Sequence, residues 1–437
     1  MSSTLGQGRV ALAALSGVLL LGSACVSAEE FSFDASEFAQ KTFEFSGFVE
    51  QKEEGLKLRS GSPAFKLAYP GEPGRDGLLR SSSTLELSGK ANLGDFVLDA
   101  RAQASLADDA LVSSTRKPSV MEGGLRWSAS PGLSFDAGKR VQRWGKGYAW
   151  SPVAMVERPK DANDPQASRE GFVMASGEWT KSLSGGPVST VSLMGLVVPT
   201  DGSMNRDFGQ SQDLNPAARL YLLAWDTDID LMWRAKGARP ASFGVDFSRN
   251  LSPALEIHGE WARTLDAPRT TVSASGITSS DRVDVDSYLL GLRYLSQSEV
   301  TWIAEYYRNG AGYSAQEFDA YYQFLDLALA PGAPAALASQ TRSVAQSGYA
   351  RPNPGRDYLY LKASVSEPFN WVYGAASVST MVNLNDHSYQ ITPELSYTGF
   401  SNWELRGRLI LLAGSARTEF HEKTASQRLE VYARYFF

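Results

Sequence analysis

Apolar and polar side chains alternate along many short stretches of this chain. In the last nine residues, one face of the predicted strand carries Leu429, Val431, Ala433, Tyr435 and Phe437. The opposite face carries Glu430 and Arg434. The same period of two recurs over residues 96–104, 255–261 and 404–411. Strands with one apolar and one polar face fit a transmembrane β-barrel, with lipid outside and water inside, although a soluble sandwich also contains such strands.

Turn-forming residues divide the chain into segments of about ten residues, joined alternately by short and long connections. Short connections are predicted at residues 92–95, 130–132, 184–187, 226–228, 250–253, 296–299, 367–370 and 399–402. Long polar connections are predicted at residues 55–79, 144–170, 200–216, 265–282 and 310–356. Because transmembrane barrels have short periplasmic turns and long extracellular loops, the sequence predicts an all-β, up-and-down antiparallel transmembrane β-barrel of about 18 strands, with about 16 as the alternative. The weakest strand predictions are 229–236 and 241–249.

The N-terminal residues have the features of an export signal. Arg9 precedes an apolar run at 10–24, and Val26-Ser27-Ala28 forms a small-x-small cleavage site. We therefore expect a signal peptide at 1–28, a periplasmic N-terminal segment at 29–41 and the barrel at 42–437. The segment at 29–41 is expected to be a solvated leader, with a plug of the periplasmic mouth as the alternative. No later stretch reaches the ~20 apolar residues of a membrane-spanning helix.

Cysteine usage and charge narrow the classes of partner. Cys25 is the only cysteine and stands where a lipoprotein signal places its acylated residue, but Gly22 occupies the position of that motif's leucine, so lipidation stays open. Cleavage after Ala28 would leave no cysteine for a disulfide or a thiolate metal site. The net charge of −6 argues against nucleic acid as a partner.

Residues 138–172 combine glycines, prolines and a cluster of charged residues in one connection. Gly145 and Gly147 permit backbone bends, while Pro152, Pro159 and Pro165 stiffen the path. The side chains that we expect at a constriction of the pore are Arg140, Gln142, Lys146, Arg158, Lys160, Asp161, Asp164 and Arg169. If this third outer loop, at 144–170, folds inward, its cations would face its own two aspartates across a narrow aqueous passage. The alternative is an ordered surface loop, and the sequence predicts no sign of charge selectivity.

Two motifs resemble known outer-membrane proteins. The terminal Phe437, with Tyr435 two residues before it, resembles the signal by which Gram-negative outer-membrane proteins are recognised for insertion, which implies the barrel-assembly machinery as a partner. The run from Trp144 to Tyr148, followed by Pro152 and by the Pro-x-Asp-x-x-Asp-Pro stretch at 159–165, resembles poorly characterised porin-like proteins of proteobacteria. The resemblance is specific only over 138–172 and matches no single characterised porin. It implies passive diffusion of small polar solutes, a barrel set in outer-membrane lipid and lipopolysaccharide, no cofactor, and leaves a homo-oligomer open.

Two other classes of function compete with a channel. A barrel could sheathe a cytochrome or export a polysaccharide, although the chain has no Cys-x-x-Cys-His site of its own. An outer-membrane hydrolase would need a catalytic constellation, and His258, His387 and His421 lie in no catalytic motif. The cluster of Glu256, His258 and Glu260 could bind a metal, but we interpret it as a hydrated lumen wall. We therefore expect no enzyme and no metal site.

Overall fold

The computed structural model describes residues 41–437 except 70, 73, 110 and 111. The predicted signal peptide and the predicted segment from 29 to 40 lie outside the described residues. Residues Thr42–Phe437 form one compact unit. Its strands are β1 (Phe43–Leu58), β2 (Gly77–Leu93), β3 (Phe96–Asp109), β4 (Val112–Ser130), β5 (Leu133–Arg140), β6 (Phe172–Ser182), β7 (Val188–Val197), β8 (Pro216–Ala224), β9 (Thr227–Arg234), β10 (Ser242–Ser252), β11 (Leu255–Val272), β12 (Thr278–Leu295), β13 (Thr301–Arg308), β14 (Asp357–Ser366), β15 (Gly374–Asn383), β16 (Tyr389–Tyr397), β17 (Trp403–Ala413) and β18 (Ala425–Phe436). No helix in this part of the chain is long and apolar enough to cross a membrane.

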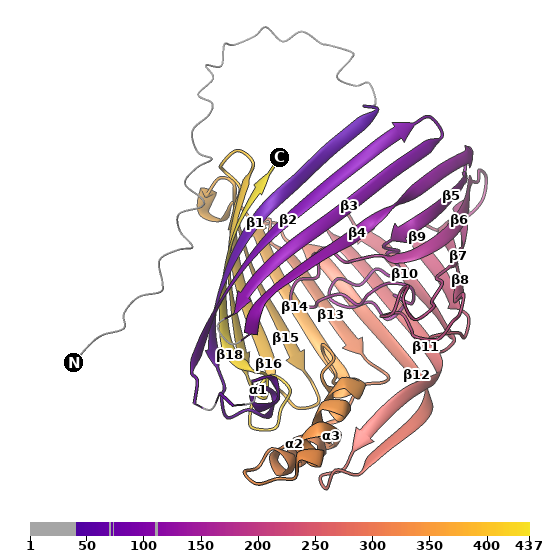
Figure 1. Cartoon of the computed structure of the whole chain (residues 1–437). Coiled ribbons are helices and arrows are strands. Elements are labelled where there is room, and N and C mark those ends of the chain that lie inside the picture. Colours follow the sequence, from indigo (N-terminus) through magenta and orange to yellow (C-terminus); the bar gives the residue numbers. More distant parts are fainter. Residues whose placement is uncertain (1–40, 70, 73, 110–111) are drawn as a thin grey trace. The chain divides into compact units, whose positions relative to one another are not determined.

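The strands form a single closed sheet. Each strand pairs with its neighbours in sequence, and β1 also pairs with β18, where Val49 lies opposite Tyr435. Figure 1 shows the resulting barrel wall. The predicted up-and-down antiparallel barrel is confirmed, with 18 strands rather than 16. Strands β9 and β10 lie where the two weakest strand predictions were made.

Side chains alternate between the two sides of the wall, as predicted. On β18, Val431 is 52% exposed and its neighbour Glu430 only 2%. Apolar side chains face outward and charged ones inward, which is the arrangement that lipid outside and water inside require. Near the short turns, outward aromatic rings pack in rows, since Trp127 stacks against Phe96 and Phe135 at centroid distances of 6.1 and 5.6 Å.

The eight short turns lie where the sequence predicts them, but one predicted loop is wrong. The stretch 265–282 is mostly strand, because β11 and β12 continue to Val272 and from Thr278. Both faces of this hairpin extension carry polar residues, so the period of two disappears from the sequence. Cross-strand pairs such as Thr270 with Ser280, whose hydroxyls lie 3.1 Å apart, preserve the ladder.

The connection between β13 and β14 contains helices that the prediction of a polar loop missed. They are α2 (Ala315–Ala328), α3 (Ala335–Val344) and the short η2 (Ala345–Tyr349), while α1 (Pro63–Ala68) lies in the first long connection and η3 (Pro368–Asn370) in a short turn. Ser314 and Glu317 form a capping box at the start of α2. Helices α2 and α3 pack on the β11–β12 hairpin through a buried apolar cluster that includes Val272, Phe318 and Phe324. Figure 1 shows α1, α2 and α3 together at the long-loop end.

Candidate functional site

Residues 141–171, called loop 3 below, connect β5 to β6 and pack against the inward face of the barrel. One apolar cluster joins the loop to strands β6, β7 and β9; it contains Trp144, Val153, Met155, Val156, Met174, Met194 and Met232. A second cluster joins the loop to β14 and β15 through Trp150, Tyr358, Tyr360 and Met381. The loop therefore contacts strands on several sides of the barrel and is no free surface loop.

Two buried glutamates of the barrel wall hold the backbone of loop 3. Glu260 on β11 accepts hydrogen bonds from the N–H groups of Lys146 and Gly147, at 2.7 and 2.6 Å. Glu305 on β13 accepts from the N–H groups of Tyr148 and Ala149, the latter at 2.8 Å. Both carboxylates are almost fully buried, with 3% and 0% exposure. Because a buried carboxylate needs several donors to replace its water shell, the two glutamates and loop 3 stabilise each other.

The two glycines of loop 3 make this contact sterically possible. Gly145 has a φ of 98°, and a Cβ at this position would collide with the Ser151 hydroxyl and the Glu260 carboxylate. A Cβ on Gly147 would collide with the carbonyl of Trp150. The Trp-Gly-x-Gly-Tyr pattern is therefore the sequence signature of a backbone that must lie directly on a carboxylate.

Aromatic and amide contacts extend the attachment along the wall. Trp150 stacks on Tyr307 at a centroid distance of 5.1 Å. The Lys362 ammonium donates to the Tyr148 hydroxyl at 2.8 Å, and further along the loop the Gln390 amide donates to Asn163 at 2.6 Å. Loop 3 thus reaches from β5 to β16.

The first three predicted constriction residues lie where the chain leaves β5. The Arg140 guanidinium bridges Asp136 and Asp99 at 2.6 and 2.5 Å. Gln142 lines the adjoining cavity. The Lys146 ammonium lies 2.9 Å from the Asp230 carboxylate.

The other five predicted residues are distributed along loop 3. Arg158 pairs with Asp207 at 2.9 Å, Lys160 donates to the Gly147 carbonyl, and Arg169 pairs with Glu157. Asp161 accepts from Asn163 within the loop. Asp164 faces the wall, where Arg408 lies at 3.2 Å. The loop cations thus do not pair with Asp161 or Asp164 as expected. The acid that pairs with Lys146 stands on a strand, that of Arg158 in another loop, and that of Arg169 in loop 3 itself.

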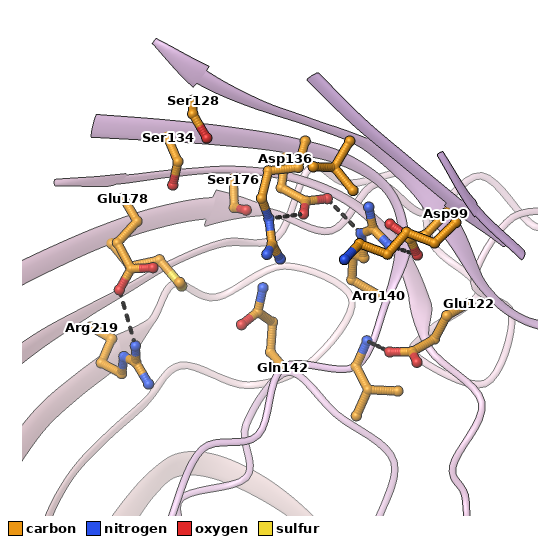
Figure 2. A pocket seen from close by; sticks show the side chains of 15 residues that line it. Asp99, Glu122, Ser128, Ser134, Asp136, Arg140, Gln142, Ser176, Glu178 and Arg219 are labelled. Atoms are coloured by element: carbon orange, nitrogen blue, oxygen red, sulfur yellow. Dashed lines mark hydrogen bonds and ion pairs between the residues drawn. The ribbon is translucent and has the colours of Figure 1, made fainter. Parts of the chain in front are cut away.

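A cavity of about 690 Å³ lies between the start of loop 3 and strands β2 to β8, on the short-turn side of the loop. Four basic and four acidic side chains line it: Lys90, Arg126, Arg140, Arg219, Asp99, Glu122, Asp136 and Glu178. Figure 2 shows most of them joined in pairs, with Arg140 between two aspartates and Arg219 beside Glu178. The cavity is polar and its charges balance.

One acid of loop 3 has a shifted pKa. Burial raises the pKa of the Glu157 carboxyl to about 7, because the loss of water outweighs the opposing charges of Arg169 and Lys160. Burial also lowers the pKa of the Lys160 ammonium, against the attraction of nearby glutamates. The core of loop 3 is thus a place where holding a charge is costly.

The histidine cluster has a structural role that the sequence did not reveal. His258 and Glu260 are 4% and 3% exposed, so the interpretation of a hydrated wall is wrong for both. The His258 Nε2 atom lies 3.0 Å from Glu305, and Glu260 holds the loop. Across the described residues, no group of His, Cys, Asp and Glu could hold a metal ion. Glu305 was missed because a single acid among the tyrosines of β13 carries no local signal.

The closed wall, the inward loop and the charged cavity define a porin-like β-barrel. No family model and no curated protein matches the chain. Among solved structures, OccK5 (OpdH) of Pseudomonas aeruginosa is similar, with a TM-score of 0.51 and 11% identity over 90% of this chain and 98% of that chain. OccK11 (OpdR) of the same organism has a TM-score of 0.47 and 11% identity, over 90% and 96%. A mutant of the Rhodopseudomonas blastica porin has a TM-score of 0.43 and 10% identity, over 90% and 100%. At these identities the likeness shows the fold alone.

Proposed function

We propose that this protein is an outer-membrane channel for passive diffusion of small polar solutes. The observation that carries the proposal is the charged cavity beside loop 3, inside a closed wall whose outer face is apolar. A barrel of this strand number encloses an aqueous channel rather than a packed core. Lipid and lipopolysaccharide surround the barrel, and the C-terminal strand is the segment that the assembly machinery recognises.

Loop 3 acts as the constriction in this proposal. Its attachments to Glu260, Glu305 and Gln390 support a fixed position across the lumen, where it reduces the cross-section available to solutes. Charged groups on loop 3 and on the wall, such as Asp164 and Arg408, favour hydrated polar solutes over apolar ones. Because loop 3 occupies part of the lumen, we do not favour a sheath for a cytochrome or a wide polysaccharide exporter, since both need an empty bore.

Conductance of the purified barrel in a planar lipid bilayer tests this function. We expect discrete current steps, and swelling of proteoliposomes in small sugars but not in large oligosaccharides. Barrel protein that is folded and inserted, yet passes neither ions nor sugars, would contradict the proposal.

A further inference from the structure

A second cavity, of about 390 Å³, lies on the long-loop side of loop 3 and differs from the first in charge. Loop 3, the connection before β14 and the β17–β18 loop line it together. Its lining has four basic side chains and one acidic one: Lys160, Arg351, Lys423, Arg428 and Asp161. The cavity on the short-turn side is balanced, so the excess of positive charge belongs to the outer side alone.

Much of this charge has no acidic partner. Within the described residues, neither Lys160 nor Arg351 forms an ion pair, and Arg351 is exposed. The Lys423 ammonium lies 3.8 Å from the nearest carboxylate oxygen of Glu419, which is a long distance for an ion pair. Arg428 is more closely paired, at 3.3 Å from Glu430, but remains 38% exposed. Arg351 in particular faces water with no acidic partner among the described residues, and it has donors to spare for a ligand.

Like charges also crowd the neighbouring rim. Arg239 stacks over Phe208, 4.0 Å from the ring centroid, and its pKa is lowered to about 10 by burial and then by the charges of Arg158 and Arg351. Asp207 is the one acid that opposes this effect. Crowded cations repel one another, and a bound anion would relieve that repulsion.

Neutral polar groups complete the lining. The amides of Asn163, Asn353 and Gln390 border the same cavity. A pocket of this volume suits a small solute rather than a polymer. Amides and cations together recognise an oxyanion with further hydroxyl or carbonyl groups.

We propose that this outer cavity is a binding site for small solutes that carry a carboxylate or a phosphate, and that it collects them on the long-loop side of the constriction. The proposal rests on the channel function proposed above and adds the class of solute. Arg351 and Lys423 are its accessible contacts, and Lys160 forms its floor on loop 3.

The test measures block of the channel current by inorganic phosphate and by succinate, with glucose as the neutral comparison. We expect both anions to reduce the current, and the Arg351→Gln/Lys423→Gln double variant to need about a hundredfold more of either, since the loss of each charged contact costs about tenfold. Arg342→Gln, at an exposed cation of α3 that lines neither cavity, is the matched control and should leave the half-blocking concentration unchanged. If only one of the two anions blocks the current, the site is specific for that class of anion, phosphate or carboxylate.

Calorimetry of the detergent-folded barrel with phosphate separates this proposal from the channel function. A barrel that conducts no ions but binds phosphate through Arg351 and Lys423 would overturn the channel and support the site. A conducting barrel that is blocked equally in the wild type and the double variant, or equally by glucose, would overturn the site and leave the channel standing.

Discussion

Glu260 on β11 accepts a hydrogen bond from the backbone N–H of Gly147 at 2.6 Å, although the two residues are 113 positions apart in the chain. Lys146 and Ser151 donate to the same carboxylate. The path of loop 3 is therefore set by β11, which is adjacent to neither β5 nor β6 in the sheet, as well as by its own two ends.

Replacing Glu260 by alanine should loosen loop 3. The substitution leaves the N–H groups of Lys146 and Gly147 without an acceptor, at a cost of about 1–3 kcal/mol each. We expect a larger and noisier single-channel conductance and a lower melting temperature. Glu256→Ala is the control, because that more exposed side chain accepts from Ser248 and lies 3.7 Å from His258, and neither of these residues belongs to loop 3. Equal conductance in both variants would show that the loop does not depend on this carboxylate.

The cost of alanine at Gly145 should exceed that at Gly185. Both glycines have positive φ, 98° and 85°, but a Cβ at Gly185 meets nothing within 4 Å. Gly185→Ala should thus cost only the backbone strain, about 1 kcal/mol, whereas Gly145→Ala adds a collision with Ser151. Heat-induced unfolding in detergent measures the difference. Equal melting temperatures for the two variants would show that loop 3 accommodates a Cβ at Gly145 without a collision.

Loop 3 should make the barrel more stable in mild acid. The folded-state pKa of Glu157, about 7, lies above its ordinary value of 4.5, so the folded protein binds the extra proton. This stabilisation is complete below about pH 4.5 and is lost as the pH rises through 7, a total of about 3 kcal/mol. Melting temperatures from pH 5 to pH 8 should therefore fall more steeply for wild type than for Glu157→Gln. Asp161→Asn, at an exposed acid of the same loop, should keep the wild-type slope.

The helices at the outer mouth should loosen in high salt. Arg417 in the β17–β18 loop pairs with Asp326 and Asp319 of α2 at 3.2 and 3.6 Å, and all three side chains are about half exposed. Salt screens such pairs, whereas the apolar contact of α2 with the β11–β12 hairpin persists. Arg417→Glu should increase proteolysis between α2 and α3 at low salt, and adding Asp326→Arg should restore protection. Arg342→Glu, which removes an exposed cation of α3 that forms no ion pair within the described residues, should have no effect.

The C-terminal aromatic should matter more for insertion in cells than for the folded barrel. The backbone of Phe437 exchanges two hydrogen bonds with Gly47, which an alanine would keep, and Tyr435 faces outward beside Trp403. Phe437→Ala should therefore lower the amount inserted in the outer membrane while refolding into detergent remains efficient. Phe436→Ala, one residue earlier, is the control. Equal loss in both settings would assign Phe437 to barrel stability instead.

The strands of this barrel are predictable because their signal is local. Adjacent residues such as Glu430 and Val431 differ in polarity, which indicates that they lie on opposite faces of a strand. Gly, Pro and Asn residues indicate where the turns lie. The Ser314-x-x-Glu317 pattern of the capping box is also present in the sequence, although it lies in a stretch that was interpreted as a polar loop.

The attachments of loop 3 are not predictable in this way. Its glycines indicated a bend, but nothing near Gly147 in sequence points to Glu260 or Glu305. These partners come from strands whose register only the closed barrel fixes. The partner of Lys146 is likewise Asp230 on β9 rather than the nearby Asp161.

The order of the strands gives the two glutamates a further consequence. Loop 3 follows β5, whereas Glu260 and Glu305 stand on β11 and β13, so a chain that ends at β10 has the loop but neither carboxylate. Such a chain also lacks β18, which closes the sheet on β1. The seating of loop 3 and the closure of the wall therefore both require the second half of the polypeptide.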